Sequence, residues 1–525
     1  MRPGVWRPPV EPSPAEQAVI KAVRRAKLFV FLRQHRHELF DEEFQAELAV
    51  SYAASPKGHP PVPPAQLALA TILQAYTGAS DDEVIEATVM DRRWQLVLDC
   101  MDADRPPFAK GTLVGFRARL IEADLDRRLV ERTVTLAGTT KGFGARALRA
   151  ALDSSPLWGA GRVEDTINLM GHALRKALGV IAVSQGWGQA AGTAIVAAQA
   201  GVGQLAASSL KAALDRDWDD PAARDAALAE VLGLLERVEA FVAGSFGDQA
   251  AAAAVAAARQ VRDQDVELSG PAPSLRRGVA KDRRISVEDA QMRHGRKSRS
   301  VLFDGYKRHV LTDLDTGLIP AVGITPANAP EASVTASITA DLDAAGLTLA
   351  ELHIDRAYLS SDLVRDRGPD LAIYCKAWRV RNTGGRYAKG QFTIDFTTGQ
   401  LTCPAGVSMG FQPDTTVHFP KHTCAACPLR ERCTTSSNGR SVSIHPDEAL
   451  LAELRQRQQT PAGRAELRER VQVEHALAHV GHWQGRRARY RGTRKNLLDL
   501  RRVAVVHNLH VIARQPATGS YQLAA

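Results

Sequence analysis

Three acidic residues stand where their carboxylates could hold divalent cations. Asp153 closes the apolar run ALRAALD, Asp355 closes the run LAELHID, and Glu474 lies in a stretch of helical spacing, one turn after Arg470. Two carboxylates and a third group are what a two-metal site needs for phosphoryl displacement, with the ions roughly 3.5–4 Å apart. Hard cations such as Mg²⁺ select oxygen ligands of this kind. Each signal alone has an ordinary alternative, because an Asp after a strand usually only forms a turn.

A basic segment follows the glutamate. Six Lys or Arg residues and one Tyr, but no acid, lie between positions 486 and 495, which is typical of a surface that tracks phosphates. The alternative is the solvated end of a packed helix. Upstream, Lys307 and His309 stand two apart on a predicted strand and share a face, which either holds a phosphate or is a polar edge. The candidate DNA-binding residues are Lys307, His309, Arg470, Arg486, Arg487, Arg491, Arg494 and Lys495.

Four of the six cysteines form a separate group. Cys403, Cys424, Cys427 and Cys433 follow the spacing C-x20-C-x2-C-x5-C, and the other two cysteines lie outside it. Two cysteines separated by two residues provide a tight turn that brings thiolates together, so we predict a structural zinc site. A set of reduced surface or core cysteines is the alternative. A catalytic zinc is disfavoured, because four thiolates leave no coordination position open.

The composition bounds the size of the protein and the kind of partner. A chain of 525 residues predicts roughly two to four folded units. The net charge of +9 and the isoelectric point near 9.3 favour a polyanionic partner. No apolar segment follows a basic N-terminus, so we expect no secretory signal, and cysteines without an export signal indicate a reducing compartment. The long uncharged stretch 177–210 is interrupted by Ser, Gln and Gly, so we expect a packed helical region and no membrane span.

Helical signals dominate two regions of the chain. In residues 1–140, Pro64 begins a helix that Gly78 ends, and Ser80 with Glu83 predicts a capping box for the next helix. Several short helices of this kind form either a DNA-reading module or a bundle for dimerisation. Residues 161–270 are rich in alanine and predict an inserted helical block for packing or self-association.

Strand signals lie on either side of that block. We predict a first strand that ends at Asp153, and a β-hairpin from 303–312 and 318–325 around residues 315–317. A helix over 330–345 and a strand that ends at Asp355 follow, and the run LAIYCKAW predicts a further strand. In the Glu474 stretch, Leu467, Val471 and Ala478 lie on the same helical face as the carboxylate, which predicts that this face is the apolar one.

These residues, with the motifs around them, resemble the DDE transposases of bacterial insertion sequences, in the group with a cysteine-rich segment before the catalytic glutamate. The resemblance spans nearly the whole chain. In chain order the motifs are DSS at 153, RHGRKS at 293, DGYKRH at 304, TPAN at 325, IDRAYLS at 354, TCPAG at 402, CPLRERCT at 427, RERVQVEHALAH at 468 and RARYRGTRKN at 487.

The resemblance implies an α/β protein with an RNase H-like catalytic core in which Asp153, Asp355 and Glu474 are the metal ligands. Two Mg²⁺ or Mn²⁺ ions per active site and a structural Zn²⁺ on the four cysteines are the implied cofactors. The implied reaction is cleavage of DNA at the element ends, followed by strand transfer of the freed 3′ hydroxyl into target DNA. The implied partners are double-stranded DNA, from both transposon ends and target, and a second or further copy of the chain on that DNA. The implied location is the bacterial cytoplasm, at the nucleoid.

The resemblance and the helix and strand signals together predict the domain boundaries. We expect an all-α N-terminal domain, a catalytic core interrupted by a helical insertion, a small cysteine-rich insertion and C-terminal helices that complete the core. The ranges are 1–140 for the N-terminal domain, 145–160 for the first core strand, 161–270 for the helical insertion, 285–380 for the continued core, 381–445 for the cysteine-rich insertion and 446–515 for the C-terminal helices.

One motif departs from the family pattern. Relatives often carry Y-x2-R-x3-E-x6-K around the glutamate; Arg470 and Glu474 fit, but Leu467 and Gly481 stand at the Tyr and Lys positions. The Lys of the signature is associated with the transposon end, so the candidates to replace it are Arg486, Arg491, Lys495 and, more weakly, His482. Two other functions stay open at this point: a nuclease of the same fold that cuts without joining, and a catalytically inactive DNA-binding regulator.

Overall fold

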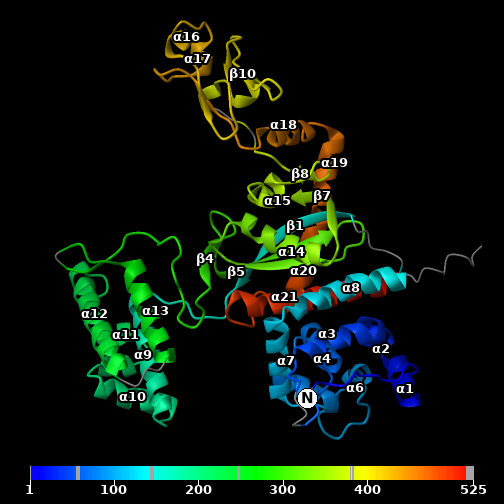
Figure 1. Ribbon diagram of the computed structural model, residues 1–525. Coiled ribbons are helices and arrows are strands. Elements are labelled where there is room, and N and C mark those ends of the chain that lie inside the picture. The colour runs from blue at the N-terminus through cyan, green and yellow to red at the C-terminus, as the bar shows by residue number, and fades with distance from the viewer. Residues whose placement is uncertain are drawn as a thin grey trace, which may run out of the picture.

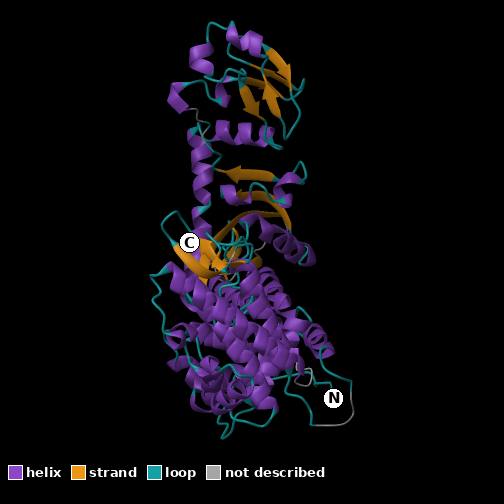
Figure 2. Ribbon diagram, turned by 90° about the vertical axis from the view of Figure 1, so that its left-hand side faces the viewer, coloured by secondary structure: helices purple, strands orange, loops and turns teal. Residues whose placement is uncertain are grey.

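The computed structural model describes residues 2–54, 59–141, 147–244, 249–270, 272–378, 380 and 383–515. A central sheet lies between three other bodies (Figure 1): the N-terminal helices, a helical block formed by α9–α13, and a small strand-containing unit at the far end of the molecule. Figure 2 shows this last unit held away from the sheet by helices. In the described residues, none of the helices has both the length and the apolar character needed to cross a bilayer.

The N-terminal body is built around α4, whose residues from Pro64 to Ala75 are all buried. The predicted ends of this helix are confirmed: Pro64 lies in its first turn and Gly78 adopts the left-handed conformation at its C-cap, with φ of 78°. The predicted capping box of Ser80 and Glu83 is also present. The helices are α1 (Pro14–Ala22), α2 (Lys27–Leu39), α3 (Glu42–Val50), α4 (Pro64–Thr77), α5 (Asp81–Met90), α6 (Arg92–Leu98), α7 (Lys110–Glu122) and α8 (Leu125–Lys141).

The central sheet is mixed, and its strands follow the order β4-β5-β1-β7-β8, with β6 also paired to β5. Strands β1, β4 and β6 each pair with β5 in antiparallel fashion, whereas β7 pairs with β1 in parallel and β8 pairs with β7 in parallel. The predicted hairpin is confirmed as the β5–β6 pair. The strands are β1 (Ala147–Trp158), β4 (Arg293–Arg296), β5 (Leu302–Asp313), β6 (Ala321–Pro326), β7 (Thr348–Ile354) and β8 (Ala372–Cys375).

The prediction that the first strand ends at Asp153 is wrong. Strand β1 continues to Trp158 because residues 154–158 pair with 305–309 of β5. Its parallel partner β7 does stop, with Ile354 opposite Leu152. Asp153 therefore lies within a strand, beside the point where β7 ends and Asp355 follows.

Helices cover both faces of the sheet. On one face, α14 packs on β6, and α18 contributes Leu450, Leu451 and Leu454 to the same core. On the other face, α20 and α21 pack on the sheet and share a second core with the N-terminal helices, so the two bodies are continuous. These elements are α14 (Thr335–Ala344), α15 (Asp362–Arg365), α18 (Glu448–Arg457), α19 (Pro461–Glu469), α20 (Val471–Gln484), α21 (Thr493–Arg514) and the short 3-10 turns Glu331–Val334 and Arg356–Tyr358.

The apolar face predicted for the Glu474 stretch is also wrong. The helix is interrupted at Arg470, and α20 buries Val473, Ala476, Leu477 and Val480. Val471 is exposed, and so is Glu474. The carboxylate lies on the solvent side of α20 because the adjacent face of the helix packs against the sheet.

The helical block and the cysteine-rich unit each have their own hydrophobic core. The block consists of α9 (Thr166–Ser184), α10 (Gln189–Gln199), the 3-10 turn Gly203–Ala206, α11 (Leu210–Leu214), α12 (Pro221–Gly244) and α13 (Gln249–Asp265), with the strand pair β2 (Val266–Glu267) and β3 (Ser274–Leu275) beside it. The cysteine-rich unit consists of β9 (Thr393–Asp395), β10 (Gln400–Thr402), β11 (Ser408–Gly410), β12 (Thr416–His418), β13 (Ser441–Ser443), α16 (Lys421–Ala425), α17 (Arg430–Cys433) and the 3-10 turns Thr383–Gly385 and Lys389–Gln391.

Candidate active site

Three elements bring the predicted carboxylates to one cavity. Asp153 on β1 and Asp355 at the end of β7 are neighbours, because Leu152 and Ile354 are register partners in the parallel pair. Helix α20 packs across β1 and β5 and carries Glu474 to the same place. All three carboxylates line a cavity of about 700 Å³, together with Ser154, Lys307, Arg308 and Arg486 among other residues.

The Asp153 carboxylate is more buried than that of Glu474. The Asp153 side chain is 14% exposed, and its oxygens accept hydrogen bonds from the Ser154 amide at 2.8 Å and from Arg470 Nη1 at 2.6 Å. Burial raises the pKa of Asp153, the Arg470 charge opposes this, and nearby Asp355 adds to it. Asp355 is held by its own hydrogen bond, because its Oδ1 accepts from the Ala357 amide at 2.8 Å.

Arg470 lies between the carboxylates. One guanidinium nitrogen donates to Asp153, and the other lies 3.5 Å from Glu474 Oε1. The residue stands at the junction of α19 and α20, where the helix axis is interrupted. The structure thus directs Arg470, predicted as a DNA contact, toward the acidic residues.

The donor set fits divalent cations in its chemistry, since three carboxylates from different elements face one cavity. In the described part of the chain, however, no three His, Cys, Asp or Glu side chains converge closely enough to hold an ion as they stand. At the carboxylates, the Arg470 guanidinium contacts two of the three, Asp153 and Glu474.

His309 does not form the phosphate contact that was predicted for it. Its ring is fully buried, with Nδ1 paired to the Tyr358 hydroxyl at 2.8 Å and Nε2 to Thr325 Oγ1 at 2.9 Å. Burial lowers the pKa of His309 to about 3, so the ring is neutral. Its strand neighbour Lys307 lines the carboxylate cavity and donates to the Ala329 carbonyl at 2.9 Å.

Arg308 is a residue that the sequence argument missed. It is buried, and it donates to Ser155 Oγ at 2.8 Å, to Gln484 Oε1 at 3.1 Å and to the Gly485 carbonyl at 2.9 Å. It thereby joins β1 and β5 to the end of α20. Its guanidinium also lies 3.2 Å from the point where a Cβ of Gly481 would be, so a cation stands beside the position of the missing signature Lys.

The other basic candidates divide into two groups. Arg494 is paired with Asp124 and Asp126 of the N-terminal body, Arg491 with Glu288, and Arg487 donates to the Gly159 carbonyl. These three contacts join elements of the protein, while Arg487 and Arg491 stay exposed, and their role as DNA contacts remains a prediction. Arg486 and Lys495 are exposed, and Arg486 also lines the carboxylate cavity.

The four cysteines of the predicted zinc site line a second cavity, of about 210 Å³, in the cysteine-rich unit. All four are free thiols. Burial raises the pKa of Cys433, the Arg440 charge opposes this, and the other three thiols add to it. The Cys424 sulfur accepts a hydrogen bond from the Arg440 amide at 3.5 Å, and the Gly406 amide donates to the Cys403 carbonyl in a tight turn.

Two family models match the chain. The model described as "Transposase DDE domain" matches residues 402–513, and the one described as "Transposase domain (DUF772)" matches residues 23–119. No curated protein and no solved structure matches the chain. The first match contains Glu474 and the four clustered cysteines; Asp153 and Asp355 lie outside both. The mixed α/β sheet fits the RNase H-like core of such a domain. The two transposase matches, in separate parts of the chain, support a DDE transposase of insertion sequences, and the DDE domain indicates an enzyme that cleaves or transfers phosphodiester bonds.

Proposed function

We propose that this transposase cleaves DNA at the ends of its element and joins the freed 3′ hydroxyl to target DNA, with Asp153, Asp355 and Glu474 as its catalytic metal ligands. The observation that carries the proposal is that these three carboxylates, from β1, the end of β7 and α20, line one cavity. Divalent cations bound there would activate the attacking oxygen and stabilise the leaving oxygen. Mg²⁺ or Mn²⁺ fits an all-carboxylate donor set.

The residues around the carboxylates orient the metal ligands and bind the DNA substrate. The Ala357 amide fixes Asp355, and Arg470 holds Asp153 beside Glu474. Arg486 lines the same cavity, and its exposed positive charge attracts a DNA phosphate to it. Arg308 adds positive charge to the cavity wall, whereas Lys307 is paired at 3.5 Å with Glu331 of the same lining.

The test is cleavage of a DNA duplex that carries the element's own end, with Mg²⁺, by the intact protein and by Glu474→Gln. We expect the substitution to lower specific nicking by more than about 100-fold, because it removes a metal ligand. Glu466→Gln is the matched control, since Glu466 lies in α19 outside the cavity. Nicking by Glu474→Gln at the rate of the intact protein would remove Glu474 from the site.

A second readout separates the proposed reaction from its alternatives. Strand-transfer products on a plasmid target support the joining step, whereas nicking without joined product indicates a nuclease. End binding without nicking by the intact protein indicates a regulator that no longer performs the chemistry.

A structural Zn²⁺ on Cys403, Cys424, Cys427 and Cys433 is the second part of the proposal. Four free thiols around one small cavity support it, as does the amide hydrogen bond to the Cys424 sulfur. Such an ion would stabilise a unit whose own hydrophobic core is small.

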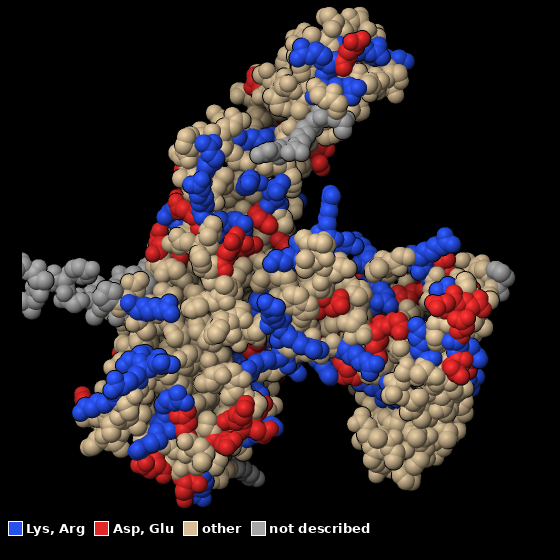
Figure 3. Space-filling model, turned by 180° about the vertical axis from the view of Figure 1, so that it is seen from behind, with Lys and Arg blue, Asp and Glu red and all other residues tan. Residues whose placement is uncertain are grey.

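The third part concerns the partners, which are double-stranded DNA and a second copy of the chain. The reaction must bring two element ends together, which two protomers can do. The helical block supports this arrangement, because residues 177–210 contain no charged side chain and the lower end of the block is uncharged on the face in Figure 3. Val183 and Trp187 are large apolar side chains exposed in this region.

A further inference from the structure

A second cavity lies beside the carboxylate cavity, and basic residues dominate its lining. It measures about 1040 Å³ and is bounded by the ends of β7 and β8, by α18 and by α19. It shares Asp355 and Arg470 with the active-site region. We call it the basic hollow, because six of its 17 lining residues are Arg or Lys and one, Asp355, is acidic. The six are Arg356, Lys376, Arg455, Arg464, Arg468 and Arg470.

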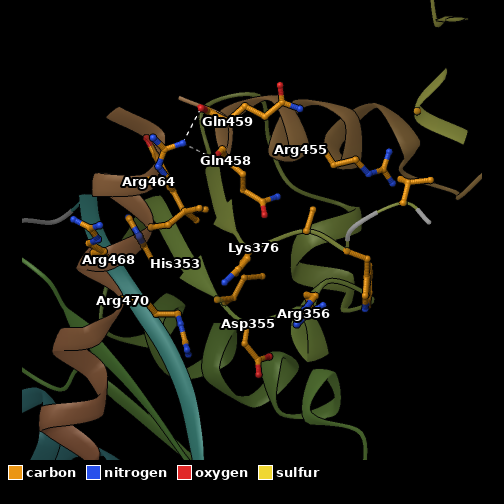
Figure 4. A pocket seen from close by; sticks show the side chains of 17 residues that line it. His353, Asp355, Arg356, Lys376, Arg455, Gln458, Gln459, Arg464, Arg468 and Arg470 are labelled. Atoms are coloured by element: carbon orange, nitrogen blue, oxygen red, sulfur yellow. Dashed lines mark hydrogen bonds between the residues drawn. The ribbon is translucent and has the colours of Figure 1, made fainter. Parts of the chain in front are cut away.

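The cations approach from two sides. Figure 4 shows Arg464, Arg468 and Arg470 on the helical side, with Lys376 and Arg356 at the ends of the strands. Within the described part of the chain, the side chains of Arg356, Lys376 and Arg468 make no hydrogen bond or ion pair, and all three residues are exposed. Unpaired cations that converge on a hollow attract a polyanion, and the phosphates of a nucleic-acid strand are the polyanion that this enzyme handles.

Aromatic residues give the hollow a second kind of binding group. Trp378 is 46% exposed and lines the hollow, with the Arg356 guanidinium 6.0 Å from the centre of its ring. Tyr374 lines it as well, but its ring is already occupied: it stacks on His353, with ring centres 4.3 Å apart, and the Arg457 guanidinium lies 4.4 Å from its centre. An exposed aromatic ring beside cations is how proteins bind unpaired bases, because a base offers its face for stacking only when no neighbouring base covers it.

Two buried polar side-chain atoms of the lining residues lack a hydrogen-bond partner in the described structure, His353 Nδ1 and Arg455 Nε. His353 is 1% exposed, and its Nε2 lies 3.4 Å from the Glu351 carboxylate.

We propose that the basic hollow binds an unpaired segment of the DNA strand next to the bond that is cut, with its phosphates on Lys376, Arg356 and Arg468 and a base stacked on Trp378. The proposal rests on the proposed function, because it assigns the hollow to the same substrate. It adds that the duplex must open next to the active site.

The test measures affinity without catalysis. The full-length protein in EDTA is titrated into a fluorescein-labelled thymidine oligonucleotide of about 12 nucleotides and, separately, into a duplex of equal length, with fluorescence anisotropy as the readout. We expect Trp378→Ala to weaken single-strand binding by roughly five- to 100-fold and duplex binding by less than about twofold. The double variant Lys376→Ala/Arg468→Ala is expected to lower the salt dependence of single-strand binding, by a slope of about 0.7 for each phosphate that the protein no longer neutralises.

Two controls make the result specific. Phe396→Ala removes an exposed aromatic side chain from the cysteine-rich unit, and Arg365→Ala removes an exposed cation that is paired with Asp362 outside the hollow. Both are expected to bind the single strand as the intact protein does. Unchanged single-strand affinity in Trp378→Ala, or equal weakening of both probes, overturns the proposal. Because the assay contains no divalent cation, failure of the metal-site assignment appears separately, as end cleavage that persists in Glu474→Gln.

Discussion

The Arg470 guanidinium lies between the carboxylates of Asp153 and Glu474, in the space that a divalent cation bound to both would occupy. This guanidinium binds Asp153 Oδ2 at 2.6 Å and lies 3.5 Å from Glu474 Oε1, so it competes with a cation for the same oxygens. We expect Arg470→Gln to bind Mn²⁺ more tightly than the intact protein, by up to roughly fivefold, in isothermal titration calorimetry. This corresponds to the free energy of about 1 kcal/mol that a partly exposed ion pair contributes.

The same variant should be less stable without metal. Asp153 is mostly buried, and it would keep its charge but lose its counter-charge, so the thermal midpoint in EDTA is expected to fall. Arg468→Gln is the control, because Arg468 is exposed two residues away and makes no contact with the carboxylates. Weaker Mn²⁺ binding by Arg470→Gln would mean that Arg470 orients the ligands for the ion and does not compete with it.

His309 makes the fold sensitive to acid. Its pKa is lowered from 6.5 to about 3 by burial, so the folded state stays unprotonated where the unfolded chain takes up a proton. Between pH 6.5 and 3 the unfolded state binds more protons, and the free energy of unfolding therefore falls as the pH falls. The slope approaches about 1.4 kcal/mol per pH unit for this one group.

Substitution of His309 by Gln should reduce this sensitivity. Gln keeps one donor and one acceptor but does not titrate, so the fall in thermal midpoint from pH 7.5 to about pH 5 is expected to be smaller in His309→Gln. Part of the fall will remain, because burial also lowers the pKa of His507 and of His510 to about 4. His482→Gln changes an exposed ring, and its thermal midpoint should fall with pH as much as that of the intact protein. Identical pH slopes in all three proteins would contradict the assignment.

The cysteine-rich unit depends on its metal if the zinc proposal holds. We expect about one zinc per chain in the purified protein and a loss of most of it in Cys424→Ser, because tetrahedral thiolate sites need all four ligands. Elemental analysis by mass spectrometry measures this. Cys375→Ser is the matched control, since Cys375 is buried beside the central sheet and belongs to another core. A zinc-free preparation whose residues 383–445 remain protected from proteolysis would refute the site.

Helix α20 depends on Arg308 for its position. That side chain connects β5 to Ser155 of β1 and to the last residues of α20, so it fixes the helix that carries Glu474. Burial lowers the pKa of Arg308 to about 10, which still leaves the guanidinium charged near neutral pH. Gly481 gives this group its space, because any side chain there would begin 3.2 Å from it.

The bodies of the molecule are joined by α21, whose residues pack on both α4 and β6 (Figure 1). The Asn508 side chain shows the connection in detail. It donates to Thr133 of α8 and to the Ile319 carbonyl, and it accepts from the Ile319 amide at 2.7 Å. The N-terminal body and the catalytic sheet therefore share a core, whereas the helical block has a core of its own.

The helical block is the surface on which we expect self-association. Trp187 is 48% exposed in its uncharged region, so Trp187→Asp should convert a dimer into single chains. Light scattering coupled to size-exclusion chromatography, with end DNA present, measures the mass. Met90→Asp changes an equally apolar side chain, 75% exposed in the N-terminal body, and should leave the mass unchanged. The same mass for intact protein and Trp187→Asp would exclude this surface.

Signals within a few residues of one another were enough to predict several helix ends and one hairpin from the sequence. Pro64 and Gly78 delimit α4, Ser80 and Glu83 form the capping box, and the hairpin of β5 and β6 is present. These signals work because dihedral preferences and cap hydrogen bonds act within a few residues. The transposase family was also recognised from the motifs and their order, and the family models support that recognition.

Which side chains are unpaired and which face solvent depends on the tertiary structure. Strand β1 passes Asp153 because a partner strand some 150 residues later pairs with it, and α20 turns Glu474 outward because the sheet takes its other face. His309 is buried, and Arg494 is held by acids of the N-terminal body, although both read as surface residues in the sequence. Burial and ion pairing depend on segments that meet only in the folded chain, so a local pattern of basic residues cannot predict them.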